Sequence, residues 1–238
     1  MTTRTTKTSP LIIARVAGFL YLLTVPLGVF NFLYIPSNMI VSGDAAATTH
    51  NIMASESLFR LGIVSALLGS IIAILYLLIL YKLLKPVSKD SAALMVIVAL
   101  MGNPITMLNE VTQLGVLQLL SGADYLTVFT TAQLQALAYL FVRLHSYGIS
   151  IAFIFSGLWL LPLGYLVFKS GFLPRILGVL LIIGGFGYLL DVFAGFLIPG
   201  SNLSIGLFTG LSEIFFLLWL LIKGVNVEQW EKRVAESA

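Results

Sequence analysis

The sequence has no cysteine and few charged residues. Only 10% of its 238 residues are Asp, Glu, Lys or Arg, whereas a soluble domain carries about 25%. Without cysteine, the chain forms no disulfide, thiol nucleophile or thiolate metal site. Its 13 basic and 10 acidic side chains are too few to cover a soluble protein of this length, and a net charge of +3 is too small for a nucleic-acid binder. A soluble enzyme, a disordered chain and a nucleic-acid-binding protein are therefore excluded.

Histidine is also scarce, which limits metal chemistry. The sequence has two histidines, His50 and His145, so one chain does not build a three-histidine zinc site. A mixed site of His145 with Glu56, Asp191 or Glu213 is the remaining alternative. The sequence contains no Gly-x-Ser-x-Gly elbow, Walker loop or His-Glu-x-x-His motif. We therefore expect no metal and no cofactor, and the sequence leans against an enzyme.

Apolar residues make up 59% of the chain and are concentrated in long runs. A helix needs about 20 apolar residues to cross a bilayer, and such a helix satisfies its own backbone hydrogen bonds in lipid. We predict an all-α membrane bundle of six transmembrane helices. They occupy Leu11–Tyr34, Leu58–Leu84, Ser91–Leu120, Gln133–Phe168, Pro174–Ile198 and Ser204–Ile222.

The predicted bundle occupies residues 11–224, between short tails at 1–10 and 225–238. Placing the N-terminus inside puts 11 of the 13 Lys and Arg residues on the cytoplasmic side, and leaves out only Arg60 and Arg143. This distribution predicts an inner-membrane protein with both termini in the cytoplasm. A cleaved signal peptide does not fit, because the first apolar run is too long and no cleavage site follows it.

Two of the helices are longer than a bilayer requires. Asp44 is a good N-cap for a helix over about residues 44–57 that leads into the second span. The fourth run has 36 residues, or about 54 Å of straight helix. Both helices are expected to extend on the outer side, and they either project straight or break near the membrane surface. Ser55 and Gly148 are the candidate break points, and Pro162 is expected to bend the fourth helix.

Ionisable residues inside these spans are the candidate functional residues, because each costs about 2.5–3.5 kcal/mol to insert. By their distance from the outer turns, all lie in the outer half of the membrane, and their charges nearly balance. We therefore expect one polar cluster that opens outward and binds a ligand or handles protons. Its members are Arg60, Glu110, Arg143, His145, Asp191 and Glu213, with Glu56 paired to Arg60 at i, i+4.

Asp191 and Glu213 are expected at the same depth on facing helices. Tyr188 shares a helical stripe with Asp191, and Gly210 shares one with Glu213. If those stripes meet, the two carboxylates do not both ionise unless an arginine lies between them. The alternative is that each acid only hydrogen-bonds neighbouring helices together. Two roles also remain for His145, a ligand or a packing residue. A lone histidine is more often a packing residue than a ligand.

Several strings along the chain resemble a known family. Ala14–Gly18, Ser55–Gly62, Leu144–His145, Ser170–Gly178 and Gly187–Asp191 look like its successive signatures. The chain resembles the bacterial integral-membrane family catalogued as domain of unknown function 4386. The resemblance implies a helical prokaryotic inner-membrane protein, and it supplies no activity, cofactor or catalytic residue. Glu56, Arg60, His145 and Asp191 fall within the matched strings, whereas Glu110, Arg143 and Glu213 fall outside them.

Three classes of function follow from these patterns. The sequence favours a binder or carrier of a small amphipathic molecule or lipid, reached through an outward-facing polar cavity. The first alternative is an intramembrane hydrolase, with or without a metal. The second is a structural or regulatory membrane subunit without chemistry. The expected partners are membrane lipids and a small amphipathic ligand.

Overall fold

In the computed structural model, residues 9–198 and 205–237 are described, apart from the side chains of 206–209. The described chain is helical, and the prediction of an all-α membrane protein is confirmed. Five helices are long and apolar enough to cross a membrane, and a bent pair at the C-terminal end raises the number to six. These long helices are α1 (Pro10–Val29), α4 (Glu56–Leu84), α5 (Lys89–Leu119), α6 (Thr131–Ser170), α7 (Arg175–Leu197) and α8 (Ile205–Ile222).

The shorter elements extend or connect these helices. Helix α1 continues through a π-helical turn, η1 (Phe30–Tyr34), into α2 (Ile35–Met39), so the first span is longer than predicted. A single 3-10 turn, η2 (Asp124–Leu126), lies between α5 and α6. Helix α9 (Val227–Glu236) follows α8 after a bend of 99°.

The extended regions of the second and fourth helices behave differently from each other. Asp44 caps α3 (Ala45–Ala54), and its Oδ1 accepts a hydrogen bond from the backbone N–H of Ala47 at 2.9 Å. The chain then leaves helical geometry at Ser55 before α4 begins, so this break is where the sequence placed it. Helix α6 instead continues for 40 residues through both Gly148 and Pro162.

The chain divides into two compact units, and α1, α4, α5 and α6 contribute to both. Unit 1 consists of Met1–Leu22, Ala73–Gly102 and Phe153–Ala238. Unit 2 consists of Leu23–Ile72 and Asn103–Ala152. The core of unit 2 is formed by apolar side chains of α2, α3, α4, α5 and α6. Its buried members are Ile35, Met39, Ile52, Phe59, Ile63, Val116, Leu117, Ala138 and Val142.

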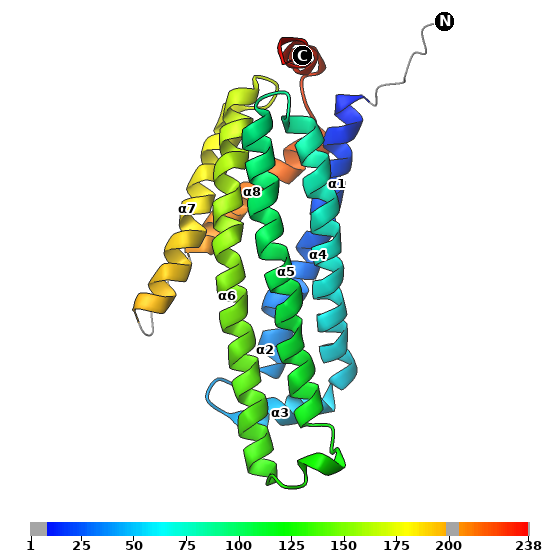
Figure 1. The fold of residues 1–238 in the computed structure, drawn as a ribbon, viewed down its shortest axis with the longest axis vertical. Coiled ribbons are helices and arrows are strands. Elements are labelled where there is room, and N and C mark those ends of the chain that lie inside the picture. Colours follow the sequence, from blue (N-terminus) through cyan, green and yellow to red (C-terminus); the bar gives the residue numbers. More distant parts are fainter. Residues whose placement is uncertain (1–8, 199–204, 238) are drawn as a thin grey trace, which may run out of the picture. The chain divides into compact units, whose positions relative to one another are not determined.

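In unit 1, α6 and α7 run side by side at very short range (Figure 1). Gly164 and Gly178 face each other, and a Cβ on either one would lie 2.5–2.6 Å from the carbonyl oxygen of the other. Seven residues along each helix, Gly157 and Gly185 also face each other. A Cβ on either one would lie 2.7–2.8 Å from the carbonyl oxygen of the other. Glycine at these four positions lets the two backbones touch, as in close helix pairs in membranes.

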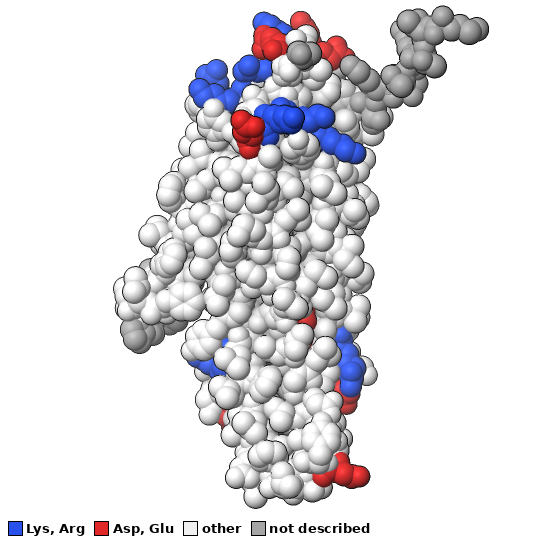
Figure 2. Space-filling model, in the orientation of Figure 1, with Lys and Arg blue, Asp and Glu red and all other residues white. Residues whose placement is uncertain are grey.

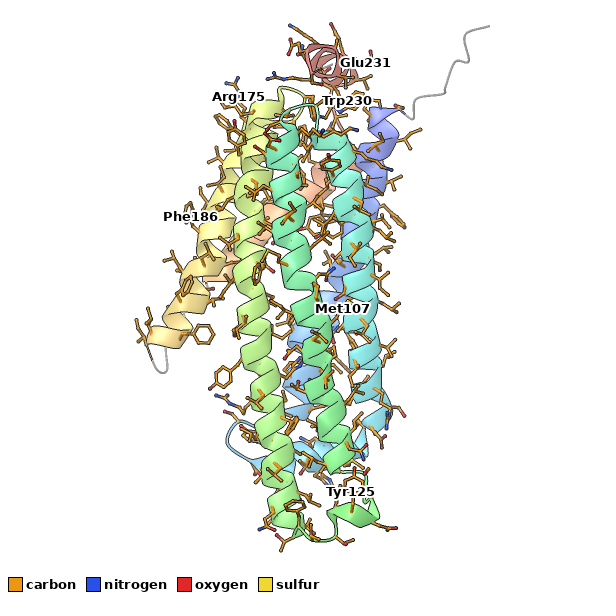
Figure 3. The ribbon with its side chains drawn as sticks, viewed as in Figure 1. Met107, Tyr125, Arg175, Phe186, Trp230 and Glu231 are labelled. Atoms are coloured by element: carbon orange, nitrogen blue, oxygen red, sulfur yellow. The ribbon has the colours of Figure 1, made fainter. Side chains whose placement is uncertain are left out.

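The outward-facing side chains of the helices are largely apolar. Leu108 is 70% exposed, Ile97 57% and Phe186 55%, and Phe186 points away from α7 (Figure 3). Large exposed apolar surface of this kind is costly in water and is accommodated by lipid. The pattern agrees with the apolar helices in assigning the chain to a membrane.

Basic side chains gather at one end of unit 1, where α4 and α6 end and α5 and α7 begin (Figure 2). Lys82 lies in the last turn of α4, Lys169 lies in the last turn of α6, and Arg175 is the first residue of α7. This is the distribution expected for a cytoplasmic membrane face.

Helix α9 is attached to the same end of unit 1. The indole N–H of Trp230 donates to the carbonyl oxygen of Leu83 at 2.9 Å, and Nη2 of Arg233 donates to that of Lys169 at 3.0 Å. These acceptors lie in the last turns of α4 and α6, where carbonyl groups lack a partner within their own helix. Gly224 has φ of +69°, which lets the chain turn between α8 and α9. Helix α9 therefore caps two membrane helices.

We expect the combined changes Trp230→Phe and Arg233→Met to release α9 from unit 1. Each removes donors to helix-end carbonyls while keeping a side chain of similar length. Amide hydrogen exchange in α9 should then accelerate by about tenfold, because its opening free energy falls by one or two hydrogen bonds. Glu236→Gln is the control, since it removes only the exposed ion pair with Arg233 at 3.3 Å. Unchanged exchange in the double variant would show that these bonds do not hold α9.

Candidate functional site

A polar stretch of α5 contacts α6 inside unit 2. Glu110 is only 5% exposed, and it lies next to Asn109 on α5. Oε1 of Glu110 lies 4.0 Å from Nε2 of His145 on α6. Among the described residues, no Lys or Arg lies within ion-pair distance of Glu110. The structure thus pairs a buried carboxyl group with an imidazole in two apolar helices.

The other ring nitrogen of His145 has both a donor and acceptors within reach. Nδ2 of Asn109 lies 3.1 Å from Nδ1, and it also donates to the carbonyl oxygen of His145 at 2.8 Å. Oγ1 of Thr112 and the carbonyl oxygen of Asn109 lie 3.2 Å and 3.4 Å from the same nitrogen. Nδ1 therefore has a hydrogen-bond partner whether or not it carries a proton. The ring can present either N–H or a lone pair to Glu110.

Gly148 makes room for this arrangement. A Cβ at Gly148 would overlap the side-chain amide of Asn109, which occupies the space where a larger residue would stand. The sequence left open whether α6 projects straight or breaks, with Gly148 as a candidate break point. Its role in the structure is instead to let Asn109 reach the backbone of His145 while the helix continues.

Gln113, one turn after Asn109, contributes an unused acceptor. Its buried Oε1 receives no hydrogen bond from any residue that the structure describes. A buried oxygen of this kind is unusual in a folded protein and marks a position where a further donor fits. Asn109, Glu110, Thr112 and Gln113 thus form one polar stretch of α5.

In unit 1, Asp191 and Glu213 each contact a residue other than the opposite carboxylate. Oδ1 of Asp191 accepts from the backbone N–H of Ile205 at 3.0 Å, and Oε2 of Glu213 accepts from the hydroxyl of Tyr21. The hydroxyl of Tyr188 lies 3.5 Å from where a Cβ of Gly210 would stand, so the two predicted stripes on α7 and α8 do meet.

The remaining candidates lie near the surface of unit 2. Arg60 and Glu56 form the predicted i, i+4 ion pair at 2.7 Å. Both are substantially exposed, so this pair contributes little to stability. Arg143 donates to the hydroxyl of Tyr147 at 3.3 Å, with its guanidinium 5.5 Å from the centre of that ring.

Of the seven sequence candidates, the structure brings together two pairs, Glu110 with His145 and Glu56 with Arg60. Arg143, Asp191 and Glu213 contact other residues. The described part of the chain contains no group of three or more His, Asp and Glu side chains placed to hold a metal ion.

The aromatic partners of Glu213 were missed by sequence reasoning. Tyr21 comes from a helix 192 positions earlier in the chain. In sequences this rich in aromatic residues, a tyrosine in an apolar run gives no signal of its partner.

Comparisons with known proteins give one family model and one curated relative, and neither description names an activity. The family model described as domain of unknown function 4386 matches residues 16–224. A relative from the archaeon Archaeoglobus fulgidus, described as an uncharacterized protein, is 32% identical over 155 residues, which cover 63% of this chain and 75% of the relative. No solved structure matches the chain.

Proposed function

Because the chain belongs to the family of domain of unknown function 4386, whose description names no activity, we propose its function from its buried polar residues. The protein is a membrane carrier of a small amphipathic molecule or lipid, and proton binding at Glu110 and His145 drives its cycle. The single observation that carries this proposal is the pair of Glu110 and His145 inside unit 2. Nδ1 of His145 has a hydrogen-bond partner in either tautomer.

The pair has the features that a proton-binding site in a membrane requires. Acidic and histidine side chains are expensive in apolar helices and are retained there mainly in proton or substrate pathways. Uptake of one proton from solution raises the net charge of the pair by one, and release of that proton to solution restores it, with the carboxyl group of Glu110 and Nε2 of His145 as the two protonation sites. Such a change of local charge biases helix packing between two arrangements, which is what a carrier needs.

An amphipathic cargo is supported by the surroundings of the pair. The described outer surface of the spans is apolar, and the unused oxygen of Gln113 offers an acceptor for a polar headgroup in the same stretch of α5. A molecule with an apolar chain and a polar head fits both features. The basic end of unit 1 supports a cytoplasmic position for both termini and an inner-membrane location.

Reconstitution into liposomes tests this function with a phosphatidylethanolamine that carries a fluorescent label on one acyl chain, because its ammonium group is a hydrogen-bond donor. We expect the wild-type protein to move this lipid between leaflets and an imposed pH gradient to accelerate the movement. Glu110→Gln should lower the gradient-driven rate by about tenfold or more, since it keeps the shape of the side chain and removes its proton chemistry. Absence of movement by the wild-type protein would refute the proposal.

Two further variants sharpen that experiment. Glu231→Gln is the matched control, because it makes the same chemical change on the exposed surface of α9 and should leave the rate unchanged. His145→Asn should resemble Glu110→Gln, and the two changes together should cost no more than either alone, as expected of residues that act as a unit. Additive losses would indicate that the two residues act separately.

A further inference from the structure

Unit 1 contains a second carboxyl group inside its helices, and aromatic side chains pack around it. Glu213 on α8 is half-buried, and Tyr21 on α1, Tyr76 on α4 and Trp159 on α6 are each at most 7% exposed. Tyr188 on α7 completes the group, which therefore draws one residue from each of five helices. We name these five residues the aromatic-carboxylate cluster.

Three of the rings pack into one continuous wall. The rings of Tyr21 and Tyr76 are stacked, with centroids 4.6 Å apart and an interplanar angle of 8°. The ring of Trp159 is tilted against both, at centroid distances of 6.4 Å from Tyr21 and 6.2 Å from Tyr76. Wide separation in the sequence makes this wall a product of tertiary packing, since the three residues come from three helices.

Glu213 is joined to this wall through Tyr21. The hydroxyl of Tyr21 donates to Oε2 of Glu213, which holds the carboxyl group at the edge of the stacked rings. Tyr188 approaches from the side of α7. Its hydroxyl lies beside Gly210, one turn before Glu213, and its ring packs against Phe153 with centroids 5.8 Å apart.

The cluster combines a carboxyl group with aromatic rings and contains no basic side chain. Among the described residues, no Lys, Arg or His lies within ion-pair distance of Glu213. A carboxylate next to aromatic faces is complementary to an organic cation, because the ring quadrupoles and the carboxylate both attract positive charge. An anionic headgroup would find no positively charged side chain in this cluster. A neutral headgroup would gain only apolar contact with the rings.

We propose that the aromatic-carboxylate cluster binds an alkylammonium group, the cationic head of an amphipathic molecule. The exposed side of the same helix, α8, carries Leu211 at 46% and Phe215 at 53%, and it provides an apolar surface for the chain of that molecule. The inference rests on the proposed function only in calling this molecule the cargo. Binding itself requires neither a proton gradient nor the Glu110–His145 pair.

Equilibrium binding to the full chain in a neutral maltoside detergent tests the site. The probes are dodecyltrimethylammonium, dodecanol as the neutral molecule with the same chain, and tetramethylammonium as the same headgroup without a chain. Isothermal titration calorimetry measures each affinity. We expect saturable binding of dodecyltrimethylammonium, at least about tenfold tighter than that of either other probe, since the site recognises both the charge and the chain.

Variants then locate the binding site. Glu213→Gln should weaken dodecyltrimethylammonium binding by about tenfold while leaving dodecanol binding unchanged. Tyr21→Phe should retain binding, because it keeps the ring and frees a carboxylate oxygen. Glu231→Gln, on the exposed surface of α9, is the control that should leave the affinity unchanged. The unfolding temperature of each variant is recorded, so that loss of binding is separated from loss of fold.

Several results would overturn the inference. Equal affinity for dodecyltrimethylammonium and dodecanol would show that only the chain is recognised. Equal affinity for tetramethylammonium and dodecyltrimethylammonium would show that the site binds a soluble cation. That result would overturn the proposal of an amphipathic ligand. Unchanged binding in a folded Glu213→Gln variant would place any cation site elsewhere. A failure here leaves the lipid-movement assay unaffected, and a failure of that assay leaves this binding measurement unaffected.

Discussion

Gly178→Leu is expected to disrupt the packing of α6 against α7 and to lower the stability of unit 1 severely. A Cβ at Gly178 would lie 2.5 Å from the carbonyl oxygen of Gly164 and 2.6 Å from the backbone nitrogen of Phe168. These contacts are with backbone atoms, which do not move aside as the end of a flexible side chain does. Overpacking typically costs about 1–3 kcal/mol, and contact with the backbone of a second helix places this change at about 3 kcal/mol or more.

Thermal unfolding in detergent, followed by tryptophan fluorescence, measures this effect. Gly195→Leu on the same helix is the matched control, because nothing lies within 4 Å of the position that its Cβ would occupy. The control should unfold at the wild-type temperature or slightly above it, since leucine favours the helix more than glycine does. Equal unfolding temperatures for the two variants would contradict the close crossing of α6 and α7.

Gly148→Ala is expected to impair the Glu110–His145 site. The added methyl group would overlap the side-chain amide of Asn109, so Asn109 must leave its bonds to His145. We expect a loss of about 1–3 kcal/mol of stability, as for other overpacked positions. The gradient-driven rate of lipid movement should fall by about tenfold, because a misplaced imidazole loses the orientation that proton transfer needs.

A double variant separates the two effects. Asn109→Ala combined with Gly148→Ala removes the overlap, so stability should recover toward the wild-type value. The rate should not recover, because Nδ1 of His145 still lacks its amide partner. Gly28→Ala is the control for a glycine with ordinary surroundings, since its Cβ would lie 3.8 Å from the ring of Phe32, an ordinary van der Waals contact. Recovery of both properties in the double variant would show that Asn109 does not position His145.

The spans were predictable from the sequence because length and hydropathy decide whether a helix crosses a bilayer. The end of α4 at Leu84 and the cap at Asp44 lie where the sequence placed them. The extension of the first span into α2, which contains Pro36, was not predicted, because the apolar run was ended at Tyr34. Pro36 occupies the first turn of α2, where its missing N–H costs nothing.

The site was predictable in its residue types and only partly in its contacts. The pair of Glu56 and Arg60 followed from helical spacing alone. The pair of Glu110 and His145 did not, because it depends on how α5 and α6 rotate against each other in unit 2. Gly148 lets Asn109 of α5 come close to α6. From sequence alone, a single glycine in a long helix is equally consistent with a break in the helix and with a close contact to a neighbouring helix. The same limit applies to the paired glycines of α6 and α7, which lie seven residues apart on each helix.

Infrared spectroscopy of the protein in lipid bilayers tests the central claim most directly, by following the carboxyl group of Glu110 while the pH is changed. The account predicts that a protonated carboxyl band appears and disappears together with an imidazole band. The carboxyl band should be absent from Glu110→Gln, and its pH dependence should be altered in His145→Asn. A spectrum in which Glu110 keeps one protonation state at every pH that preserves the fold would contradict the claim that this pair handles protons.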